Sequence, residues 1–553
     1  MARAADILVE TMGLHGIDRV FCVPGESYLA VIDALYDAPH MDVVTTRHES
    51  GASLMGVADA KMTGRAGVAM VSRGPGAANA SLGVHVAEQD AVPLVLFIGQ
   101  VARADLGRMA FQEVDYQRFF GGMAKHVVEV TDAERLPGEA AKAFAVAEGG
   151  TPGPVVVSLP EDMLLDDIGA PAAARADNDL PAPTDGQIAE IAERLAAAER
   201  PLLIAGGQID QRGGRDALRA VSEAWQIPVA VGWRHQDLFD NTHPNFAAHM
   251  AFNMPADFER TLNEADLVVA IGSRLGDVTT QGYAVPRAPK PDQPLIHVHP
   301  DAAQLGRVYE TDLEINADGT AVLEALAKMN AKPAPDGRAG WIARAHDLAA
   351  SRMAWDFPRA DDGVVFGNVI KGLAGALDDD AIIANDAGNF STWLHRLFPF
   401  KTTHTFLGAV AGAMGFGVPA AVAAGLRHPD RQVACLVGDG GFQMTGNEMS
   451  VAVERNLPIR IFVSNNGSLG TIRLYQEKDY PGRTIATDLP NPDFAALGAA
   501  FGLTAFKIET EDDVAPVIEK AMAADGPVLV EVATSLEYLA AYARMSALKA
   551  AAR

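Results

Sequence analysis

Cysteine is scarce in this sequence, with only Cys22 and Cys435 among 553 residues. Two thiols that far apart form neither the close pairs of a zinc site nor the dense, even-numbered pattern of a disulfide framework. We therefore interpret both as small buried apolar residues. A chain without a disulfide framework fits a reducing compartment, and we expect the cytoplasm.

Long apolar runs and an excess of positive charge are also missing. No uninterrupted apolar stretch reaches the roughly 18 residues of a membrane span, and the N-terminus lacks the basic and then apolar pattern of a signal peptide. Lys and Arg number 45 against 71 Asp and Glu, for a net charge of −26. Such a surface repels nucleic acid and anionic lipid, so we expect neither as a partner. The net charge does not exclude a small anionic substrate, because a local basic pocket can outweigh it.

What the sequence does contain is a threefold alternation of short β-branched runs with Ala-rich helical stretches. This alternation is typical of a parallel sheet wrapped by helices. We predict an α/β fold of three successive doubly wound parallel-sheet domains at residues 1–167, 188–331 and 355–553, with linkers at 168–187 and 332–340. The expected strands lie at 18–23, 41–46, 67–72, 93–99, 153–160, 201–207, 227–233, 265–272, 294–300, 381–388, 432–440, 459–466 and 527–533.

Two of the expected strands end in polar residues that suit a phosphate and metal site. The first runs into Gly438-Asp439-Gly440-Gly441, and the second ends in Asn465-Asn466, with Asn466 27 residues after Asp439. Glycines let backbone N–H groups approach an anion, and the next helix N-terminus adds a favourable dipole. Asp439 and Asn466 offer the hard oxygen ligands that Mg2+ prefers, at strand ends where ligands sit in open α/β sheets. The sequence therefore predicts a diphosphate held on Mg2+.

This spacing resembles the motif of thiamine-diphosphate-dependent enzymes, which opens with GDG and closes with NN, and the chain resembles the acetolactate synthase-like members. The resemblance implies that Asp439 and Asn466 donate side-chain oxygens to Mg2+, with the backbone carbonyl of Ser468 as third ligand. The three domains would be pyrimidine-binding, central and diphosphate-binding domains. The C-terminal residues implied to contact thiamine diphosphate are Gly438, Asp439, Gly440, Gly441, Asn466, Ser468, Leu469 and Gly470.

An activating carboxylate is expected in the N-terminal domain. Arg47-His48-Glu49 follows the strand expected at 41–46 and precedes a helix of small residues, and it is similar to the R-H-E segment of the family. Glu49 would hydrogen-bond N1′ of the cofactor's pyrimidine, which helps that ring take the proton from the thiazolium C2. Taken alone, Glu49 would more readily be interpreted as a cap of the following helix. Together with the C-terminal motif, we interpret it as the activator.

Three further segments carry the resemblance in the same order. Residues 72–79 resemble the S-G-P-G-A-T-N turn and bring Asn79, with Pro24, to the cofactor. Residues 110–115 match A-F-Q-E-V-D, so Gln112 and the backbone of Gly25 would line the pocket and hold the acceptor. Residues 411–421 resemble G-T-M-G-F-G-L-P-A-A. This match places Gly412 at the cofactor and makes Met414 the apolar wedge that bends it, with a core methionine as the alternative.

Some positions depart from the acetolactate synthase pattern. Glu26, in the segment VPGE, is nearer the V-P-G-D of 2-oxoacid decarboxylases and would protonate a bound intermediate, although their His-His pair is missing. Arg73 stands where a small residue is usual, and Glu161 replaces a lysine. Tyr475 replaces a tryptophan that favours one acceptor, so acceptor preference does not carry over from the resemblance.

The central domain keeps Gly206-Gly207 and Gly272-Ser273-Arg274, which look like fragments of the family's flavin site. The D-D-R and M-H-G segments of that site are not kept. FAD, an adenine nucleotide or coenzyme A, and the absence of a ligand therefore stay open as alternatives for this domain.

The resemblance implies decarboxylation of a 2-oxoacid such as pyruvate, followed by carboligation of the resulting carbanion to a second carbonyl. The residues implied in catalysis are Glu49, Glu26, Gly25, Gln112 and Met414. One alternative is a simple 2-oxoacid decarboxylase, or a 2-hydroxyacyl-CoA lyase or oxalyl-CoA decarboxylase-like enzyme that acts on an acyl-CoA. A remote alternative is a catalytically silent cofactor-binding paralogue. In such enzymes Glu49 of one subunit meets Asp439 of its partner, so a homodimer at minimum, and a homotetramer by resemblance, is expected.

Overall fold

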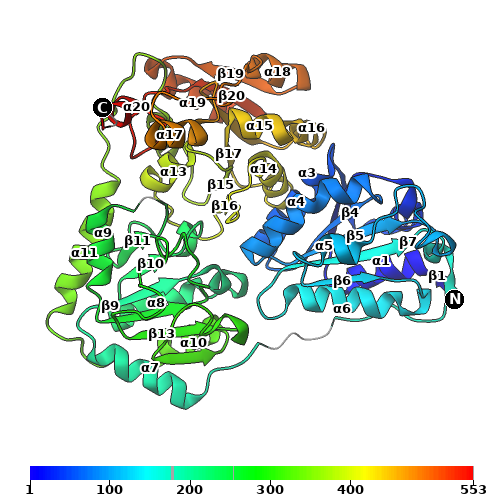
Figure 1. Ribbon diagram of the computed structural model, residues 1–553, viewed down its shortest axis with the longest axis horizontal. Helices are drawn as coiled ribbons and strands as arrows, with labels where there is room; N and C mark the ends of the chain where they lie inside the picture. Colours follow the sequence, from blue (N-terminus) through cyan, green and yellow to red (C-terminus); the bar gives the residue numbers. More distant parts are fainter. Residues whose placement is uncertain (176–179, 253, 552–553) are drawn as a thin grey trace.

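The computed structural model describes residues 1–175, 180–252 and 254–551, which form three α/β domains (Figure 1). Each domain holds one six-stranded sheet whose neighbouring strands all pair in parallel. Helices cover both faces of such sheets because parallel strands need crossover connections. The predicted fold class is confirmed.

The strand order separates the central domain from the outer two. The N-terminal sheet has the order β3-β2-β4-β5-β7-β6 and the C-terminal sheet the order β16-β15-β17-β18-β20-β19, so both follow one topology when strands are numbered within the domain. The central sheet runs β11-β10-β9-β12-β13-β14, which is the order of dinucleotide-binding folds.

The strands of the three sheets have the following bounds. The N-terminal sheet contains β2 (Arg19–Cys22), β3 (Asp42–Thr45), β4 (Gly67–Val71), β5 (Leu94–Gln100), β6 (His126–Glu129) and β7 (Pro154–Pro160). The central sheet contains β9 (Pro201–Ala205), β10 (Val229–Val231), β11 (Phe246–His249), β12 (Leu267–Ile271), β13 (Leu295–His299) and β14 (Leu313–Asn316). The C-terminal sheet contains β15 (Ile382–Asn385), β16 (Phe406–Gly408), β17 (Val433–Gly438), β18 (Ile459–Asn465), β19 (Thr504–Ile508) and β20 (Val528–Ala533).

The helices follow the strands in each domain. The N-terminal helices are α1 (Ala4–Leu14), α2 (Leu29–Tyr36), α3 (Glu49–Thr63), α4 (Pro75–Asp90), α5 (Tyr116–Phe120) and α6 (Leu136–Glu148). The central helices are α7 (Asp185–Ala197), α8 (Arg215–Trp225), α9 (Ala256–Asn263), α10 (Gly319–Ala327) and α11 (Arg338–Arg352). The C-terminal helices are α12 (Phe366–Ala376), α13 (Ser391–Leu397), α14 (Gly417–Arg427), α15 (Asp439–Thr445), α16 (Met449–Glu454), α17 (Gly470–Asp479), α18 (Phe494–Phe501), α19 (Val514–Ala523) and α20 (Met545–Ala551).

Both expected linkers are shorter than predicted. At 168–187, strand β8 (Asp167–Ile168) pairs with β1 (Ala2–Arg3), and α7 begins inside the range behind a capping box of Thr184 and Gln187. Residues 176–179 of this linker lie outside the described residues. At 332–340, α11 begins at Arg338, because Trp341 and the residues on its face pack into the central core. All strands of the three sheets fall within the predicted domain ranges, and the boundaries themselves stay a prediction.

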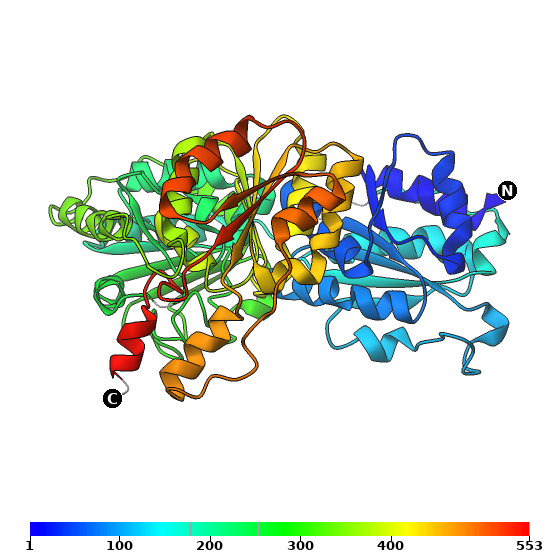
Figure 2. The same cartoon turned by 90° about the horizontal axis from the view of Figure 1, so that it is seen from above.

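The N-terminal and C-terminal domains share one apolar core. Helices α3 and α14 pack against each other, and both contain several buried Gly and Ala residues, which let their backbones approach closely. Figure 2 shows the N-terminal domain, in blue, at one end of the molecule beside the other two. The contact fixes the strand ends of the N-terminal domain against the C-terminal domain. Within the described residues, no helix combines the length and the apolar character needed to cross a bilayer.

Candidate functional site

Glu49 lies at the carboxyl edge of the N-terminal sheet, as the first residue of α3 after β3. Its Oε2 accepts a hydrogen bond of 2.9 Å from Asn79 Nδ2, which projects from the first turns of α4. Gly76 lies beside the same carboxylate, since a Cβ at that position would stand 3.4 Å from Glu49 Oε1. Two residues assigned to the cofactor from separate motifs are therefore in direct contact.

The backbone before Glu49 is held by a carboxylate from the C-terminal domain. Glu448, in the 3-10 turn η8 (Gly446–Glu448), is fully buried and accepts hydrogen bonds from Arg47 N and His48 N. Burial raises the pKa of Glu448 to about 7, although both backbone N–H groups act in the opposite direction. Gly51 faces this carboxylate, and a Cβ there would lie 2.3 Å from its Oε1. The position of Glu49 thus depends on a contact between two domains.

Glu26 lies at the end of the neighbouring strand β2, in the turn η1 (Glu26–Tyr28), and is paired. Arg73 Nη2 lies 3.0 Å from Glu26 Oε1, and Arg73 Nη1 lies 3.0 Å from Glu161 Oε2. Gly25 packs against the turn after β4, since a Cβ on it would stand 2.7 Å from the Ser72 Cβ. Three positions that depart from the family pattern therefore form one cluster.

Gln112 joins the same edge through its backbone. Gln112 has a positive φ of 64°. Its carbonyl oxygen lies so close to Gly74 that a Cβ built on Gly74 would be 2.7 Å from it. Gly74 N donates to Tyr116 Oη at 3.1 Å, which ties this loop to the turn after β4. Pro24 is exposed at the end of β2 beside Gly25. The residues predicted in the N-terminal half of the site thus share one sheet edge.

Asp439 and Asn466 follow the neighbouring strands β17 and β18, as the sequence predicted. Asn491 Nδ2 donates to Asp439 Oδ2 at 2.8 Å and to Asn465 Oδ1 at 2.8 Å. Ser468 N donates to Asn466 Oδ1 at 2.9 Å and lies 3.3 Å from Asp439 Oδ2. The three predicted metal ligands are therefore within one hydrogen-bonded cluster.

Met414 lies directly over the glycine motif. A Cβ on Gly440 would meet Leu469 Cδ2 at 2.9 Å and Met414 Cε at 3.2 Å, so the two apolar side chains converge above it. Gly412 adopts a φ of 66° with open space beside it. Gly470 begins α17 and packs against Asn389, whose Oδ1 would lie 2.6 Å from a Cβ there. The segment 412–414 is thereby placed beside the segments after β17 and β18.

Asp386, at the end of β15, contacts both the Met414 segment and the glycine motif after β17. Its carboxylate is fully buried and accepts hydrogen bonds of 2.9 Å from Gly415 N. The side chain fills the space next to Gly441, where a Cβ would lie 2.7 Å from Asp386 Oδ2. Burial raises the pKa of Asp386 to about 6. One carboxylate therefore positions both the Met414 segment and the glycine motif.

The C-terminal cluster fits a diphosphate with a cation. Asp439 is 3% exposed, and burial raises its pKa against the effect of its hydrogen bonds, so a bound cation would stabilise its charged form. Ser468 Oγ and Thr471 Oγ1 are buried at the N-terminus of α17 and have no hydrogen-bond partner among the described residues. Hydroxyl donors at a helix N-terminus suit phosphate oxygens. No trio of His, Cys, Asp or Glu that could hold a metal occurs in the described part of the chain, in keeping with a ligand set of Asp, Asn and a backbone carbonyl.

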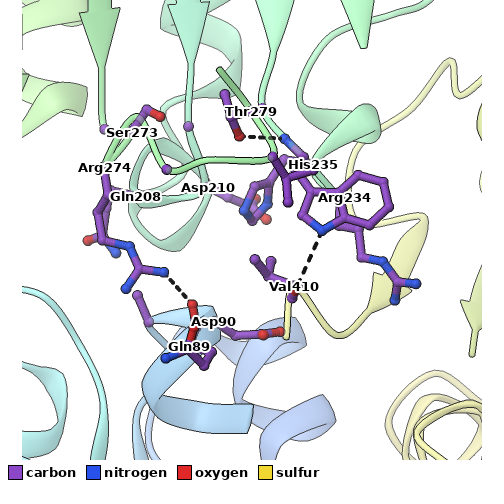
Figure 3. Close-up of a pocket in the computed structure, with 18 of the residues that line it drawn as sticks. Gln89, Asp90, Gln208, Asp210, Arg234, His235, Ser273, Arg274, Thr279 and Val410 are labelled. Atoms are coloured by element: carbon purple, nitrogen blue, oxygen red, sulfur yellow. Dashed lines mark hydrogen bonds between the residues drawn. The ribbon is translucent and has the colours of Figure 1, made fainter. Parts of the chain in front are cut away.

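A cavity lies where the central domain meets the other two, at the point where the strand order of the central sheet reverses between β9 and β12 (Figure 3). The cavity measures about 440 Å3 and is bounded by Gly206-Gly207, Gly272-Ser273-Arg274, α4 and the segment after β16. The two glycine segments touch, since a Cβ on Gly206 would lie 2.3 Å from Gly272 O. Arg274 donates to Gln89 O across the cavity, and Trp233 Nε1 donates to Val410 O at 3.2 Å.

Comparison with known proteins also finds three domains along the chain. Residues 2–119 match the N-terminal TPP binding domain of thiamine pyrophosphate enzymes, residues 188–326 their central domain and residues 386–532 their C-terminal TPP binding domain. The chain is 31% identical over 541 residues to acetolactate synthase isozyme 1 large subunit of Escherichia coli, covering 96% of this chain and 94% of the relative. It is 30% identical over 547 residues to the acetolactate synthase large subunit of Lactococcus lactis, covering 96% and 92%.

Three parallel-sheet domains, with a carboxylate cluster in the first and a glycine-lined polar cluster in the third, define a thiamine pyrophosphate enzyme, and the chain belongs to that family. Within it, the chain is an acetolactate synthase-like enzyme, of the class that forms carbon–carbon bonds. The family resemblance inferred from the motifs is confirmed.

Sequence reasoning missed three groups that hold the site together. Asp386 had a usable signal, because it ends a buried strand next to β17 and so had to lie at the same edge. Asn491 and Glu448 had none, since they do not end a strand and contact residues remote in sequence. The pairing of Arg73 with Glu26 and Glu161 was equally hidden, because it depends on the order of the strands.

Proposed function

We propose that the protein is a thiamine diphosphate- and Mg2+-dependent carboligase that decarboxylates a small 2-oxoacid and joins the remaining fragment to a second carbonyl compound. The observation that carries this proposal is the hydrogen-bonded cluster of Asp439, Asn466 and Ser468, in which Asp439 and Ser468 are buried, next to Met414 and Leu469. Full-length similarity to acetolactate synthases supports carboligation over the decarboxylase, acyl-CoA and silent alternatives.

When bound, thiamine diphosphate supplies the carbon nucleophile that adds to the 2-oxoacid and the electron sink for loss of CO2. Glu49 holds the proton at the pyrimidine N1′ in this proposal, and Asn79 fixes the carboxylate that does so. Met414 and Leu469 exclude water from the region above Gly440. Gly25 and Gln112 line the side of the pocket formed by the N-terminal domain.

Mg2+ is assigned to Asp439, Asn466 and the carbonyl of Ser468. The assignment is supported by the oxygen-only donor set and by the raised pKa of the Asp439 carboxyl, which favours a nearby cation. The buried hydroxyls of Ser468 and Thr471 would then donate to phosphate oxygens. This arrangement leaves the remaining coordination positions of the ion for the diphosphate and water.

The assembly proposed is a homodimer at minimum, and a homotetramer by analogy with the family. In this proposal Glu49 of one copy faces Asp439 of the other, and the two residues have separate hydrogen-bond partners within one chain. Large apolar side chains are exposed in the loop before α5 and along α17 and the segment that follows it, and these are Met109, Phe111, Ile472, Tyr475, Tyr480 and Ile485. The two buried free cysteines support a reducing location, the cytoplasm.

For the central cavity we propose an adenine nucleotide or FAD. Support comes from its place at the topological switch point and from Arg234, which is 3% exposed and whose Nε and Nη1 have no partner among the described residues. His235 argues against a phosphate bound close to Gly207, because its ring covers that glycine. Burial lowers the pKa of His235 to about 4, so the imidazole is neutral and offers no positive charge to a phosphate. Visible absorbance of the purified protein would identify FAD, and mass spectrometry of the released nucleotide would identify the alternative.

The test of the main proposal is product analysis. The protein is supplied with thiamine diphosphate, Mg2+ and pyruvate, and CO2 and the carbon skeletons are followed together. One five-carbon or longer ligation product per CO2 is expected, and it should be lost in Glu49→Gln. Free acetaldehyde as the sole product would favour the decarboxylase alternative. No CO2 from any 2-oxoacid in a broad panel would refute the proposal.

A further inference from the structure

The loop that carries Met414 depends on other parts of the chain for its shape. Residues 408–415, which we call the Met414 loop, run from the end of β16 toward α14. Beyond Gly408, the last residue of β16, they belong to no helix or strand. Gly412 and Gly415 have φ values of 66° and 85°, and glycines lose the most conformational freedom when they are ordered. Contacts from outside the loop must therefore fix the place of Met414.

A buried ion pair of the N-terminal domain holds the first half of the loop. Lys61 Nζ, on α3, lies 2.6 Å from Asp90 Oδ2, on α4, and the two side chains are 13% and 0% exposed. Lys61 Nζ donates to Gly408 O at 2.8 Å, and Asp90 Oδ1 accepts from Ala411 N at 2.9 Å. Each member of the pair thus binds the loop backbone directly.

The other two domains hold the same loop at further points. Trp233 Nε1, from the central domain, donates to Val410 O at 3.2 Å, and Asp386 accepts from Gly415 N at 2.9 Å. Asp90 and Val410 both line the cavity between the domains (Figure 3). The Met414 loop therefore lies between this cavity on one side and Gly440, which Met414 approaches, on the other.

The ion pair is far from the activating carboxylate. Lys61 follows Glu49 on α3 by 61 − 49 = 12 residues, which is about 18 Å at the rise of an α-helix. Asp90 follows Asn79 on α4 by 90 − 79 = 11 residues, or about 16 Å. A substitution in the pair therefore acts on the Met414 loop, which it contacts, and not directly on Glu49.

We propose that Lys61 and Asp90 are positioning residues for the carboligation reaction, which hold Met414 over Gly440 before thiamine diphosphate binds. The inference rests on the proposed function. A Cβ on Gly440 would lie 3.2 Å from Met414 Cε, so the wedge is already in place next to the glycine motif. If the loop were free, the cofactor would have to order it, and that ordering would be subtracted from the free energy of binding.

The experiment measures the loop and the cofactor separately. Hydrogen exchange of the Ala411 amide is followed without added cofactor, and calorimetry then gives the Kd of thiamine diphosphate in the presence of Mg2+. Asp90→Ala removes the acceptor of this amide, so its exchange should become about tenfold faster. The Kd should rise about tenfold and kcat should fall, while the KM for pyruvate should stay within about twofold.

Two further variants separate the contacts from the charges. Lys61→Met with Asp90→Ala removes both loop contacts and leaves no unpaired buried charge, so it tests the inference where Asp90→Ala alone does not fold. It should show the same faster exchange and weaker binding as Asp90→Ala. Lys61→Arg keeps the charge and the N–H donors, and it should hold the Kd within about threefold of wild type.

The matched control is Asp59→Asn. Asp59 also lies on α3 and pairs with Arg427 of α14 at 2.8 Å, with side chains 8% and 15% exposed. Within the described residues its carboxylate contacts Arg427 and Arg19 and not the Met414 loop. This variant should lower the unfolding temperature but leave the Ala411 exchange and the Kd within about twofold.

Two results would overturn the inference. The first is wild-type Ala411 exchange and Kd in the folded double variant, since the ion pair would then not hold the loop. The second is an equal loss of cofactor affinity in Asp59→Asn, which would assign the effect to a general loosening between the domains. Failure of wild type to bind thiamine diphosphate would refute the proposed function instead, and the Ala411 exchange would still report whether the pair holds the loop.

Discussion

Replacing Glu448 by Gln should remove a pH dependence from the segment that carries Glu49. The carboxylate is fully buried, and burial raises its pKa from the ordinary 4.5 to about 7. An acid with a raised pKa in the folded state stabilises that state below about pH 4.5, and this contribution is lost as the pH rises through about 7. At about 1.4 kcal/mol for each pKa unit, the loss is about 3 kcal/mol between these limits.

The measurement is hydrogen exchange of the Arg47 and His48 amides, which bond to Glu448, at several pH values from 5 to 8 after correction for intrinsic rates. In wild type the opening free energy should fall by about 3 kcal/mol over this range. In Glu448→Gln it should stay nearly flat, because the amide keeps an acceptor oxygen and does not ionise.

The control is Glu454→Gln. Glu454 also contacts Arg47, at 3.1 Å, but its side chain is 49% exposed. Exposed ion pairs contribute about 0–1 kcal/mol, so this variant should keep the wild-type slope. Equal slopes in wild type and Glu448→Gln would refute the reasoning, since the buried carboxylate would then not be the titrating group.

Other substitutions test the two halves of the site. Glu49→Gln should lower kcat by at least 100-fold with an unchanged circular dichroism spectrum; turnover near wild type would rule out its activating role. Asp439→Asn should weaken Mg2+ binding by at least tenfold in calorimetry, since it removes the only carboxylate of the predicted ligand set. Gly440→Ala should raise the KM for thiamine diphosphate, because its Cβ would meet Leu469 at 2.9 Å and Met414 at 3.2 Å; an unaltered KM would show that both side chains yield.

The interior strands were predictable because they are buried on both faces and read as continuous apolar runs. β5 and β7 are buried along their whole length. Within the three six-stranded sheets, the strands that no pattern revealed all lie at sheet edges, and these are β6, β11, β14, β16 and β19. β6, β14 and β19 are partly exposed and mix polar with apolar residues, and β16 has three residues. Edge strands gain their structure from a neighbour, which local sequence does not encode.

Individual site residues could be predicted from the sequence, but the contacts between them could not. Asp439, Asn466 and Glu49 each end a recognisable strand, and ligands gather at such ends in parallel sheets. The contact of Glu448 with Arg47 joins residues 401 positions apart in two domains. It depends on the packing of α3 against α14, and that packing is set by many small side chains together.

The two outer domains share one topology, but the equivalent sites in them differ in charge. In both, the strand order reverses between the first and third strands, which opens a crevice at their carboxyl ends. In the C-terminal domain this crevice holds Asp386 and Asp439, two buried carboxyls whose pKa values burial raises. In the N-terminal domain the equivalent crevice between β2 and β4 holds Arg73, a cation already enclosed by carboxylates. The first crevice therefore favours a cation taken from solution, whereas the second already contains one in the Arg73 guanidinium.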